Sequence, residues 1–513
     1  MKTKKKFTIW SLISMLLLVS MLFSACGTDA APQDTTDGEE GAESSSSELP
    51  VEIDFAYPTF NKVPEGDALA SVEEAINAIT VPDINVTVKL HPYSIVDYST
   101  QINLAIQSGE GVDVFTTLGD LPQSVTQNKI IDITDMIDEY APEAKEIVGE
   151  DFLKATTMDG KLYGIPAYKG VALAPNLVYR SDIMEAIGVD AASIASLDDL
   201  TDVFAKVKEQ YPDMVPLVPV DTGSIGLVTT LHGIDFLGDS YLNPIAVLVG
   251  DDMNVVNFYK TDEFTNLVTL ARDWYDQGFV LKDAATTTST AIELMSSGKG
   301  FAYIAAYSGH EAYTQIAAQT GQPIQMVRLG EPYLSTSSVN ALTWVIASTS
   351  EHPEAALKFM NKIFADKEVI NLIIYGIEGR DYIQLDADHV NYPEGQDAST
   401  VPYTAQLACG IVGNQFIQYQ MEGTDMGDIQ VMLDENINAD ISPAMGFSFD
   451  SSGVTNEYTA VINVIEQYVP GLITGSVDPA EIPEFLDKLE AAGIDKIVEA
   501  KQQQLDQWLS MQE

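Results

Sequence analysis

The sequence predicts an α/β protein with two lobes, and three observations lead to this fold class. First, the chain has 513 residues, and one hydrophobic core supports roughly 250 to 300 residues, so at least two lobes are expected. Second, segments with strand periodicity alternate with amphipathic helices. Third, this pattern starts again after Gly160. With 46% hydrophobic and 9% aromatic residues, the composition is that of a folded globular protein.

Residues 1–25 have the layout of a secretory signal peptide. Four lysines precede an apolar run from Phe7 to about Phe23. The segment Leu22-Phe23-Ser24-Ala25-Cys26 that follows resembles the lipobox of bacterial lipoproteins, in which the cysteine is acylated and becomes the first residue. We therefore expect a lipidated Cys26, since two or more acyl chains form a stable membrane anchor. An uncleaved membrane-spanning helix is the alternative.

Residues 26–50 are predicted to comprise the lipidated cysteine and an acidic, flexible tether that follows it. The segment has seven acidic residues, no basic residue and no aromatic residue, so it cannot bury enough apolar surface to fold. The body is acidic as well, because the whole chain carries a net charge of -50. Without the four signal lysines and the seven tether acids, residues 51–513 keep 22 basic and 69 acidic residues, a net charge of -47. This field disfavours nucleic acid and anionic lipid as partners.

The first hundred residues of the body read as a βαβαβ unit with a parallel sheet. Apolar and polar residues alternate over 51–55 and 86–90, and a third short strand is expected at Asp113–Thr117. Helices are predicted between them, over Ala68–Ile79 and Tyr98–Gln107. Sheets of this kind bind ligands beyond the carboxyl ends of their strands.

The later elements follow the same rules. After Gly160, the predicted strands are Asn176–Tyr179, Phe301–Ala306 and Leu342–Ala347, and the predicted helices cover 197–211, 264–274, 291–297 and 356–364. The last stretch, Tyr458–Leu509, is predicted to be helical with breaks at Pro470, Pro479 and Gly493.

Several segments resemble the extracellular solute-binding proteins of bacterial ABC importers, the class that includes maltose-binding protein. The resemblance rests on NALTWVIASTSEHPEAALKFMNKIFADKEVINLIIYGIEGR at 340–380, on Lys161-Leu-Tyr-Gly-Ile-Pro-Ala, and on Ser297-Gly-Lys-Gly-Phe-Ala-Tyr-Ile. The tail from Gly446 looks like a lipoprotein subfamily named LipO-like. The resemblance implies a type II periplasmic-binding-protein-like fold, in which hinge crossings join two lobes around a ligand cleft. We expect lobe 1 to comprise 51–164 and about 336–400, and lobe 2 to comprise 165–335 and about 401–513.

The resemblance implies a membrane-anchored, extracellular substrate-binding component of an ABC importer. We expect it to be a monomer without cofactor or enzymatic activity, which captures a carbohydrate, most simply a neutral oligosaccharide, and delivers it to the permease. Alternatives are a surface lipoprotein glycosidase and a binding protein for peptide or polyamine. The sequence lacks the Gly-x-Ser-x-Gly, His-Glu-x-x-His and P-loop motifs. Asp386-Ala-Asp388 begins like a calcium loop, but Val390 and Asn391 break the pattern.

Candidate ligand contacts are aromatic and planar polar residues at predicted strand ends and lobe crossings, because sugars present both apolar C–H faces and hydroxyl groups. Tyr307 follows the predicted strand Phe301–Ala306, at the position where the resemblance to maltose-binding protein implies an aromatic ring that stacks on the sugar. Core packing is the alternative for the aromatic residues, above all Trp344, and helix capping is the alternative for Asp120. A mutual ion pair is the alternative for Glu378 and Arg380. Cys409 is expected to be a buried free thiol. The full set of candidates is Tyr57, Tyr93, Asp120, Tyr168, Tyr307, Asn340, Trp344, Glu378 and Arg380.

Overall fold

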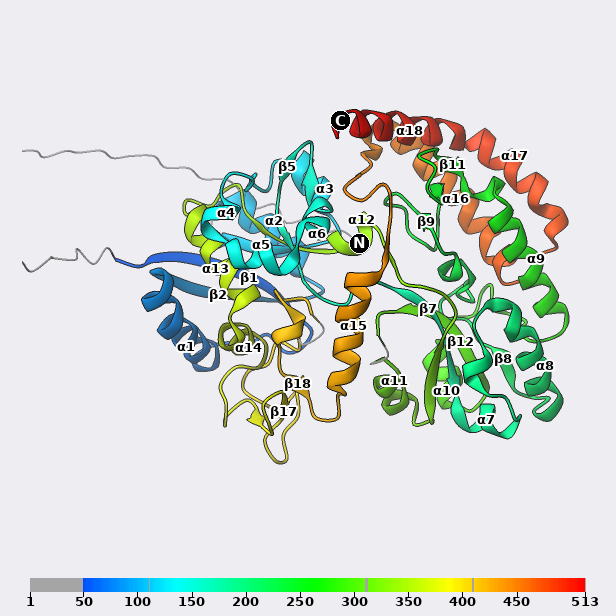
Figure 1. Ribbon diagram of the computed structural model, residues 1–513, viewed down its shortest axis with the longest axis horizontal. Coiled ribbons are helices and arrows are strands. Elements are labelled where there is room, and N and C mark those ends of the chain that lie inside the picture. The colour runs from blue at the N-terminus through cyan, green and yellow to red at the C-terminus, as the bar shows by residue number, and fades with distance from the viewer. Residues whose placement is uncertain (1–48, 110, 310–311, 408–409, 513) are drawn as a thin grey trace, which may run out of the picture. The chain divides into compact units, whose positions relative to one another are not determined.

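The computed structural model describes residues 49–109, 111–309, 312–407 and 410–512 (Figure 1). The signal peptide, the tether, Cys26 and Cys409 lie outside the described residues. Within the described ranges, none of the helices combines the length and the apolar character needed to cross a membrane.

The first sheet has five strands in the order β2-β1-β3-β15-β6. β1 (Val51–Thr59), β2 (Val86–Ser94) and β3 (Val114–Leu118) run parallel. β15 (Leu342–Ile346) pairs antiparallel with β3, and β6 (Ile165–Pro166) pairs antiparallel with β15. The expected βαβαβ unit is therefore present, and two strands from later in the chain extend it.

Helices cover this sheet because each has one apolar stripe to bury. α1 (Asp67–Ile84) and α2 (Tyr98–Ser108) are the two predicted crossover helices. α13 (Pro353–Ala365) begins with a proline, whose missing N–H is not needed in the first turn, and α14 (Lys367–Tyr375) follows it. The first core joins β1, β2 and β15 with α1, α13 and α14. α2 packs in a separate cluster with Phe115 and Val345.

The second sheet has four strands in the order β13-β7-β12-β8. β12 (Gly300–Tyr307) runs parallel to β8 (Val215–Leu217) and antiparallel to β7 (Ala174–Arg180). β7 also pairs antiparallel with β13 (Ile324–Arg328). α8 (Leu200–Gln210) and α9 (Asp262–Asp276) contribute to the second core, in which Trp274 is fully buried.

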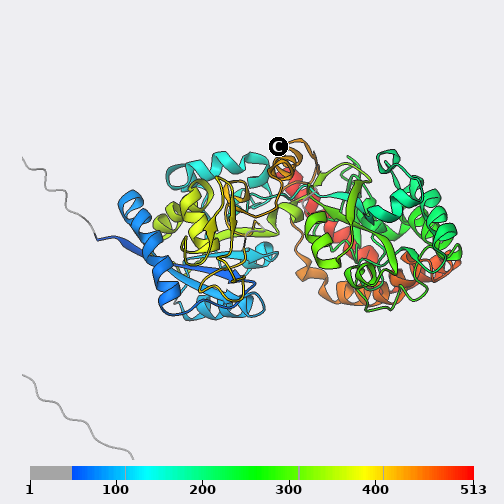
Figure 2. The same ribbon diagram turned by 90° about the horizontal axis from the view of Figure 1, so that it is seen from below.

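The C-terminal helices belong to this second core. α16 (Thr455–Ile473) contacts α9. α18 (Ile494–Ser510) contacts β10 (Ala246–Val249) and β11 (Val256–Asn257) of a small three-stranded sheet (Figures 1 and 2). α17 (Ile482–Ala492) lies between them in sequence. The predicted break at Pro470 is wrong, because α16 continues through it. This proline lies in the last turn of the helix, where its missing N–H removes only one bond of the helical ladder.

The chain returns to the first core after α14, which differs from the expected lobe border near 400. Tyr403, Leu407 and Val412 are buried in the core of the first sheet. A small sheet of β16 (Ile383–Gln384), β17 (His389–Asn391) and β18 (Gln420–Met421) lies in this returning segment. The chain enters the second core only beyond α15, which spans Met426–Asn438. The core of the first sheet is thus completed by apolar side chains that lie far from its first strands in sequence. Local periodicity cannot predict which distant segment supplies these side chains.

Candidate ligand-binding site

Three parallel strands of the first sheet end at one edge. β1 ends at Thr59, and Phe60, which follows it, is 48% exposed. Tyr93 of β2 pairs in register with Pro58 of β1, and Asp120 follows β3 by two residues. This edge holds the carboxyl ends at which parallel sheets bind ligands.

One short crossing leads from this edge to the corresponding edge of the second sheet. Leu342 pairs with Leu118 at the end of β3, and the amide of Ala167 donates to the carbonyl oxygen of Leu342 at 2.8 Å. At the other end of the crossing, Ala174 pairs with Tyr307, the last residue of β12. The crossing 167–173 therefore joins the carboxyl edge of the first sheet to the carboxyl end of β12.

A cavity of about 210 Å³ lies on this crossing. The crossing forms one wall, and α12 (Thr336–Asn340) with the start of β15 forms the other. Among the described residues that line the cavity, Lys169 is the one charged side chain. The lining residues are Ala167, Lys169, Gly170, Val171, Leu173, Ser338, Val339, Ala341 and Leu342.

Three of the candidate tyrosines stay partly exposed around these edges. Tyr307 is half-buried, its hydroxyl lies 3.2 Å from that of Tyr303, and burial raises the pKa of its phenol. Tyr168 lies at the start of the crossing, with ring centroids 5.7 Å from Phe152 and 5.2 Å from Phe416. Tyr93 is half-buried at the end of β2. All three residues are therefore partly exposed.

Tyr57 and Trp344 are core residues, so their expected ligand contacts are wrong. Both side chains are fully buried. Phe55 stacks on both rings, with centroids 5.4 Å from Tyr57 and 5.0 Å from Trp344. The hydroxyl of Tyr57 lies 2.8 Å from that of Tyr403, and the indole N–H of Trp344 donates to the carbonyl oxygen of Ile411 at 2.9 Å. β1 runs four residues beyond its predicted end, so Tyr57 lies inside the strand and on the same face as Phe55.

Asn340 and Arg380 also have structural roles. Asn340 is buried at the end of α12, two residues before β15, and its side-chain amide donates to the carbonyl oxygen of Ala155 at 3.4 Å. The guanidinium of Arg380 forms two bonds to Asp381, at 2.6 and 2.9 Å, and also donates to the hydroxyl of Ser71 in α1. Arg380 thus pairs with its sequence neighbour and not with the exposed Glu378.

Asp120 stays available at the edge of the first sheet. It occupies the N-cap position of α3 (Leu121–Thr126), but its side chain forms no cap hydrogen bond. Its backbone carbonyl oxygen accepts from the amide of Ser124 at 2.9 Å. The half-buried residue lines a small cavity of about 20 Å³ beside Tyr98 and Thr116. Asp120 therefore occupies the capping position that the alternative predicted, but its carboxylate does not cap the helix.

Two partly exposed aromatic residues were missed in the sequence. Phe60 follows β1 directly, and reading the strand at its full length would have identified it. Tyr241 is 42% exposed, and burial, with Asp221 and Tyr307 nearby, raises the pKa of its phenol. Tyr241 lies in an irregular loop between β9 (Ile234–Asp235) and β10 (Ala246–Val249), so no periodicity marked it.

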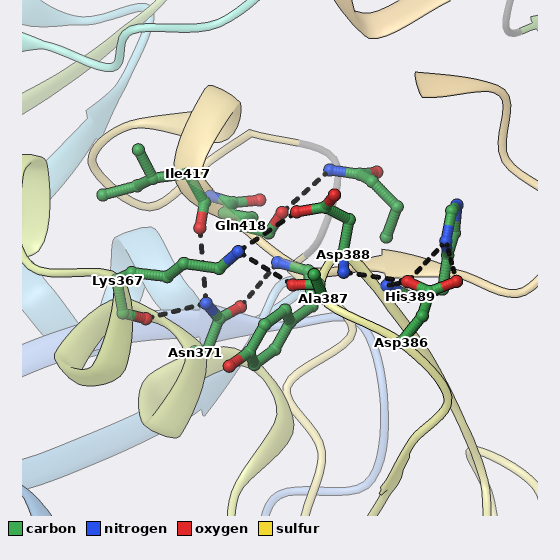
Figure 3. Close-up of polar contacts among 10 residues, drawn as sticks. Lys367, Asn371, Asp386, Ala387, Asp388, His389, Ile417 and Gln418 are labelled. Carbon is green, nitrogen blue, oxygen red and sulfur yellow. Dashed lines mark hydrogen bonds and ion pairs between the residues drawn. The ribbon is translucent and has the colours of Figure 1, made fainter.

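The acidic loop that begins like a calcium site is held by protein groups (Figure 3). The Lys367 ammonium donates to the Ala387 carbonyl oxygen at 3.1 Å and to the Asp388 carboxylate at 3.3 Å. The Asp386 carboxylate accepts from the amides of Asp388 and His389, each at 2.9 Å. Within the described part of the chain, no group of three or more His, Cys, Asp or Glu residues could hold a metal ion.

Comparisons with known proteins show which family the chain resembles. Residues 74–376 match the family described as bacterial extracellular solute-binding protein, and residues 443–510 match a domain of unknown function, DUF3502. A carbohydrate ABC transporter substrate-binding protein of Streptococcus pneumoniae serotype 4 is 24% identical over 423 residues, covering 80% of this chain and 82% of the relative. An arabinooligosaccharide-binding protein of Halalkalibacterium halodurans is 27% identical over 143 residues, covering 27% of this chain and 31% of the relative.

Solved structures show the same fold. The N-glycan transport solute binding protein NgtS of Streptococcus pneumoniae matches with a TM-score of 0.75 and 22% identity, covering 90% of this chain and all of that one. An HMO-binding, ABC-transporter-associated solute binding protein of Bifidobacterium longum infantis matches with a TM-score of 0.60 and 15% identity, covering 90% and 99% of the two chains. These likenesses confirm the expected type II periplasmic-binding-protein-like fold. Because the family match extends over 74–376, more than half of the chain, the protein belongs to the bacterial extracellular solute-binding proteins.

Proposed function

We propose that this protein is the membrane-anchored, extracellular substrate-binding component of an ABC importer and that it captures a carbohydrate. The observation that carries the proposal is the junction of the two carboxyl edges at the crossing 167–173, with partly exposed aromatic rings on both sides. A solute held there contacts both lobes, and such contact favours a closed arrangement of the lobes.

The residue types at this junction suit a sugar. Tyr93 and Phe60 on one edge and Tyr307 and Tyr241 on the other offer ring faces to apolar C–H surfaces. Asp120 offers a carboxylate to hydroxyl groups. Capture of an anion uses guanidinium forks or helix N-termini. Because residues 51–513 carry 22 basic against 69 acidic residues, a neutral oligosaccharide suits the body better than an anion.

The relatives support the same class of ligand. One is a carbohydrate ABC transporter substrate-binding protein, and NgtS was solved with Man1GlcNAc and with Man5GlcNAc. We further propose that Cys26 carries the lipid anchor, that the body is a monomer on the outer face of the cell membrane, and that it binds the sugar without cleaving it. Release of the sugar to the permease then requires only that the lobes open again.

A thermal-shift panel tests the proposal. The panel contains Man1GlcNAc, Man5GlcNAc and arabino-oligosaccharides, with peptides and polyamines as competing classes. A bound ligand at 100 times its dissociation constant adds about 2.7 kcal/mol to the free energy of unfolding. Stabilisation by a peptide or polyamine alone would refute the sugar assignment. Appearance of shorter sugars during incubation would favour the glycosidase alternative.

A further inference from the structure

The C-terminal segment 443–510, which matches a domain of unknown function, is packed tightly against the second core. Leu472 and Ile473, at the end of α16, are buried in that core. Just after them, Gly475 leaves no room for a side chain beside the carbonyl oxygen of Ala271 in α9. The carbonyl oxygen of Gly475 accepts from the guanidinium of Arg272 at 3.1 Å. The end of α16 is therefore fixed against α9.

The turn 221–224 lies at the carboxyl edge of the second sheet. It follows β8, which runs parallel to β12 and beside it (Figure 1). Leu217, the last residue of β8, pairs with Ala302, and β12 continues from there to Tyr307. The carboxyl ends of neighbouring parallel strands meet at one edge of a sheet. The turn therefore follows β8 at the same edge at which β12 ends in Tyr307.

Three contacts hold this turn. The amide of Ser224 donates to the carbonyl oxygen of Asp221 at 3.0 Å, and the amide of Gly223 donates to the carbonyl oxygen of Ala284 at 3.2 Å. Gly223 has a φ of +74°, which glycine adopts without strain. A Cβ added to Gly223 would lie 2.7 Å from the Cβ of Pro470. Through Pro470, the C-terminal segment therefore packs directly on the turn.

The turn presents a carboxylate beside two of the candidate rings. Asp221 is exposed, and its carboxylate accepts from the amide of Thr222 at 2.8 Å. Burial raises the pKa of the Tyr241 phenol, and the nearby Asp221 carboxylate and Tyr307 add to this shift. One exposed carboxylate and two partly exposed rings thus lie near one another. Sugars offer hydroxyl groups to the first and C–H faces to the second.

We propose that the C-terminal segment takes part in ligand recognition, with Pro470 positioning the turn 221–224 and Asp221 accepting hydrogen bonds from the bound solute. The same solute contacts the rings of Tyr241 and Tyr307. A turn that is held in advance loses less conformational freedom on binding, so the packing at Pro470 strengthens binding. The inference rests on the proposed function, because it assigns a polar contact within the same site.

Amide hydrogen exchange in the ligand-free protein tests the positioning role of Pro470. Pro470→Ala keeps the Cβ and the helical backbone but removes the rest of the ring that covers Gly223. We expect exchange at the amides of Gly223 and Ser224 to speed up by about fivefold. The amide of Val218, which donates to a carbonyl oxygen of β12 at 2.9 Å, should stay unchanged. Pro483→Ala is the matched control, because Pro483 is exposed in the first turn of α17, within the same segment.

Calorimetric titration with Man5GlcNAc tests the role of Asp221. Asp221→Asn keeps an oxygen for the Thr222 amide, so the turn is retained, but the charged acceptor is lost. We expect binding to weaken by about tenfold, because hydrogen bonds to a charged group are the stronger ones. Asp213→Asn is the matched control, since Asp213 is exposed at the opposite end of β8.

Three results would each overturn the proposal: unchanged exchange at Gly223 and Ser224 in Pro470→Ala, equal acceleration at Val218, or equal affinity in Asp221→Asn and the unmodified protein. Asp221 is exposed, so its variant keeps the test decisive if Pro470→Ala does not fold. Failure of the unmodified protein to bind Man5GlcNAc would count against the proposed function. The exchange measurement contains no sugar and decides the positioning role by itself.

Discussion

Replacing Lys501 by methionine should destabilise the second lobe strongly. Lys501 of α18 and Asp239 form an ion pair at 2.8 Å, with side chains 0% and 1% exposed. The ammonium also donates to the Ala246 carbonyl oxygen at 3.0 Å. Burial lowers the pKa of Lys501, although the Asp239 carboxylate opposes this shift. This pair connects α18, which lies in the segment 443–510 that matches DUF3502, to the second core.

The magnitude follows from what the substitution leaves behind. Removing one partner of a buried ion pair costs about 3 to 5 kcal/mol, because the other charge stays buried without compensation. Asp239 keeps two backbone donors, the amides of Ile245 and Ala246, and the hydroxyl of Tyr458. We therefore expect a loss near the lower end, about 3 kcal/mol in the free energy of unfolding. Adding Asp239→Asn should recover part of it, since the unpaired Asp239 charge is then removed as well.

A surface pair provides the matched control. Lys260 and Glu490 lie 2.7 Å apart, but their side chains are 43% and 50% exposed. Lys260→Met should cost less than about 1 kcal/mol, because water solvates both charges. The two lysine variants therefore compare ion pairs of similar length that differ in burial.

Urea unfolding followed by tryptophan fluorescence measures the difference. In a chain that starts at Gly27 and carries Trp344→Phe in every variant, the remaining tryptophans are Trp274 and Trp508, and both pack in the second core. The signal then reports on the lobe that contains Lys501. Equal losses for Lys501→Met and Lys260→Met would refute the reasoning from burial.

The remaining predictions concern ligand binding, anchoring and pH. Tyr307→Ala should weaken sugar binding by about 1 to 3 kcal/mol in calorimetric titration with little change in melting temperature, whereas Trp344→Ala should lower stability by about 3 to 5 kcal/mol; the reverse pattern would contradict both assignments. Cys26→Ser should abolish incorporation of labelled lipid, and full retention of label would exclude that anchor. Small-angle scattering should show a smaller radius of gyration with saturating sugar, and an unchanged radius would argue against closure. His389 faces a backbone carbonyl and a carboxylate, which raise its pKa above 6.5. Its stabilisation of the β16–β17 turn is therefore complete below pH 6.5 and is lost as the pH rises through the folded-state pKa. Amide protection in this turn, corrected for the intrinsic exchange rate, should fall over that pH range, and the same fall in His389→Gln would disprove this.

Local patterning determined much of this fold. The alternation over 51–55 and 86–90 and the helical stripes between them predicted the βαβαβ unit, because period 2 and period 3.6 are properties of the backbone itself. The same reasoning located the end of β12 and hence Tyr307. The resemblance of 340–380 to solute-binding proteins added the type II periplasmic-binding-protein-like fold, which the solved structures and the family match confirm.

Other features depend on contacts between segments far apart in sequence, and only the tertiary structure decided them. Tyr57 and Trp344 are buried because other elements pack on both faces of the first sheet. The sequence alone does not distinguish a buried aromatic residue from one that stacks on a ligand. The return of Tyr403 to the first core and the bonds of Asn436 to the crossing join segments more than 200 residues apart. Periodicity carries no information about such pairs, because it records which face of an element is apolar and not which distant segment covers that face.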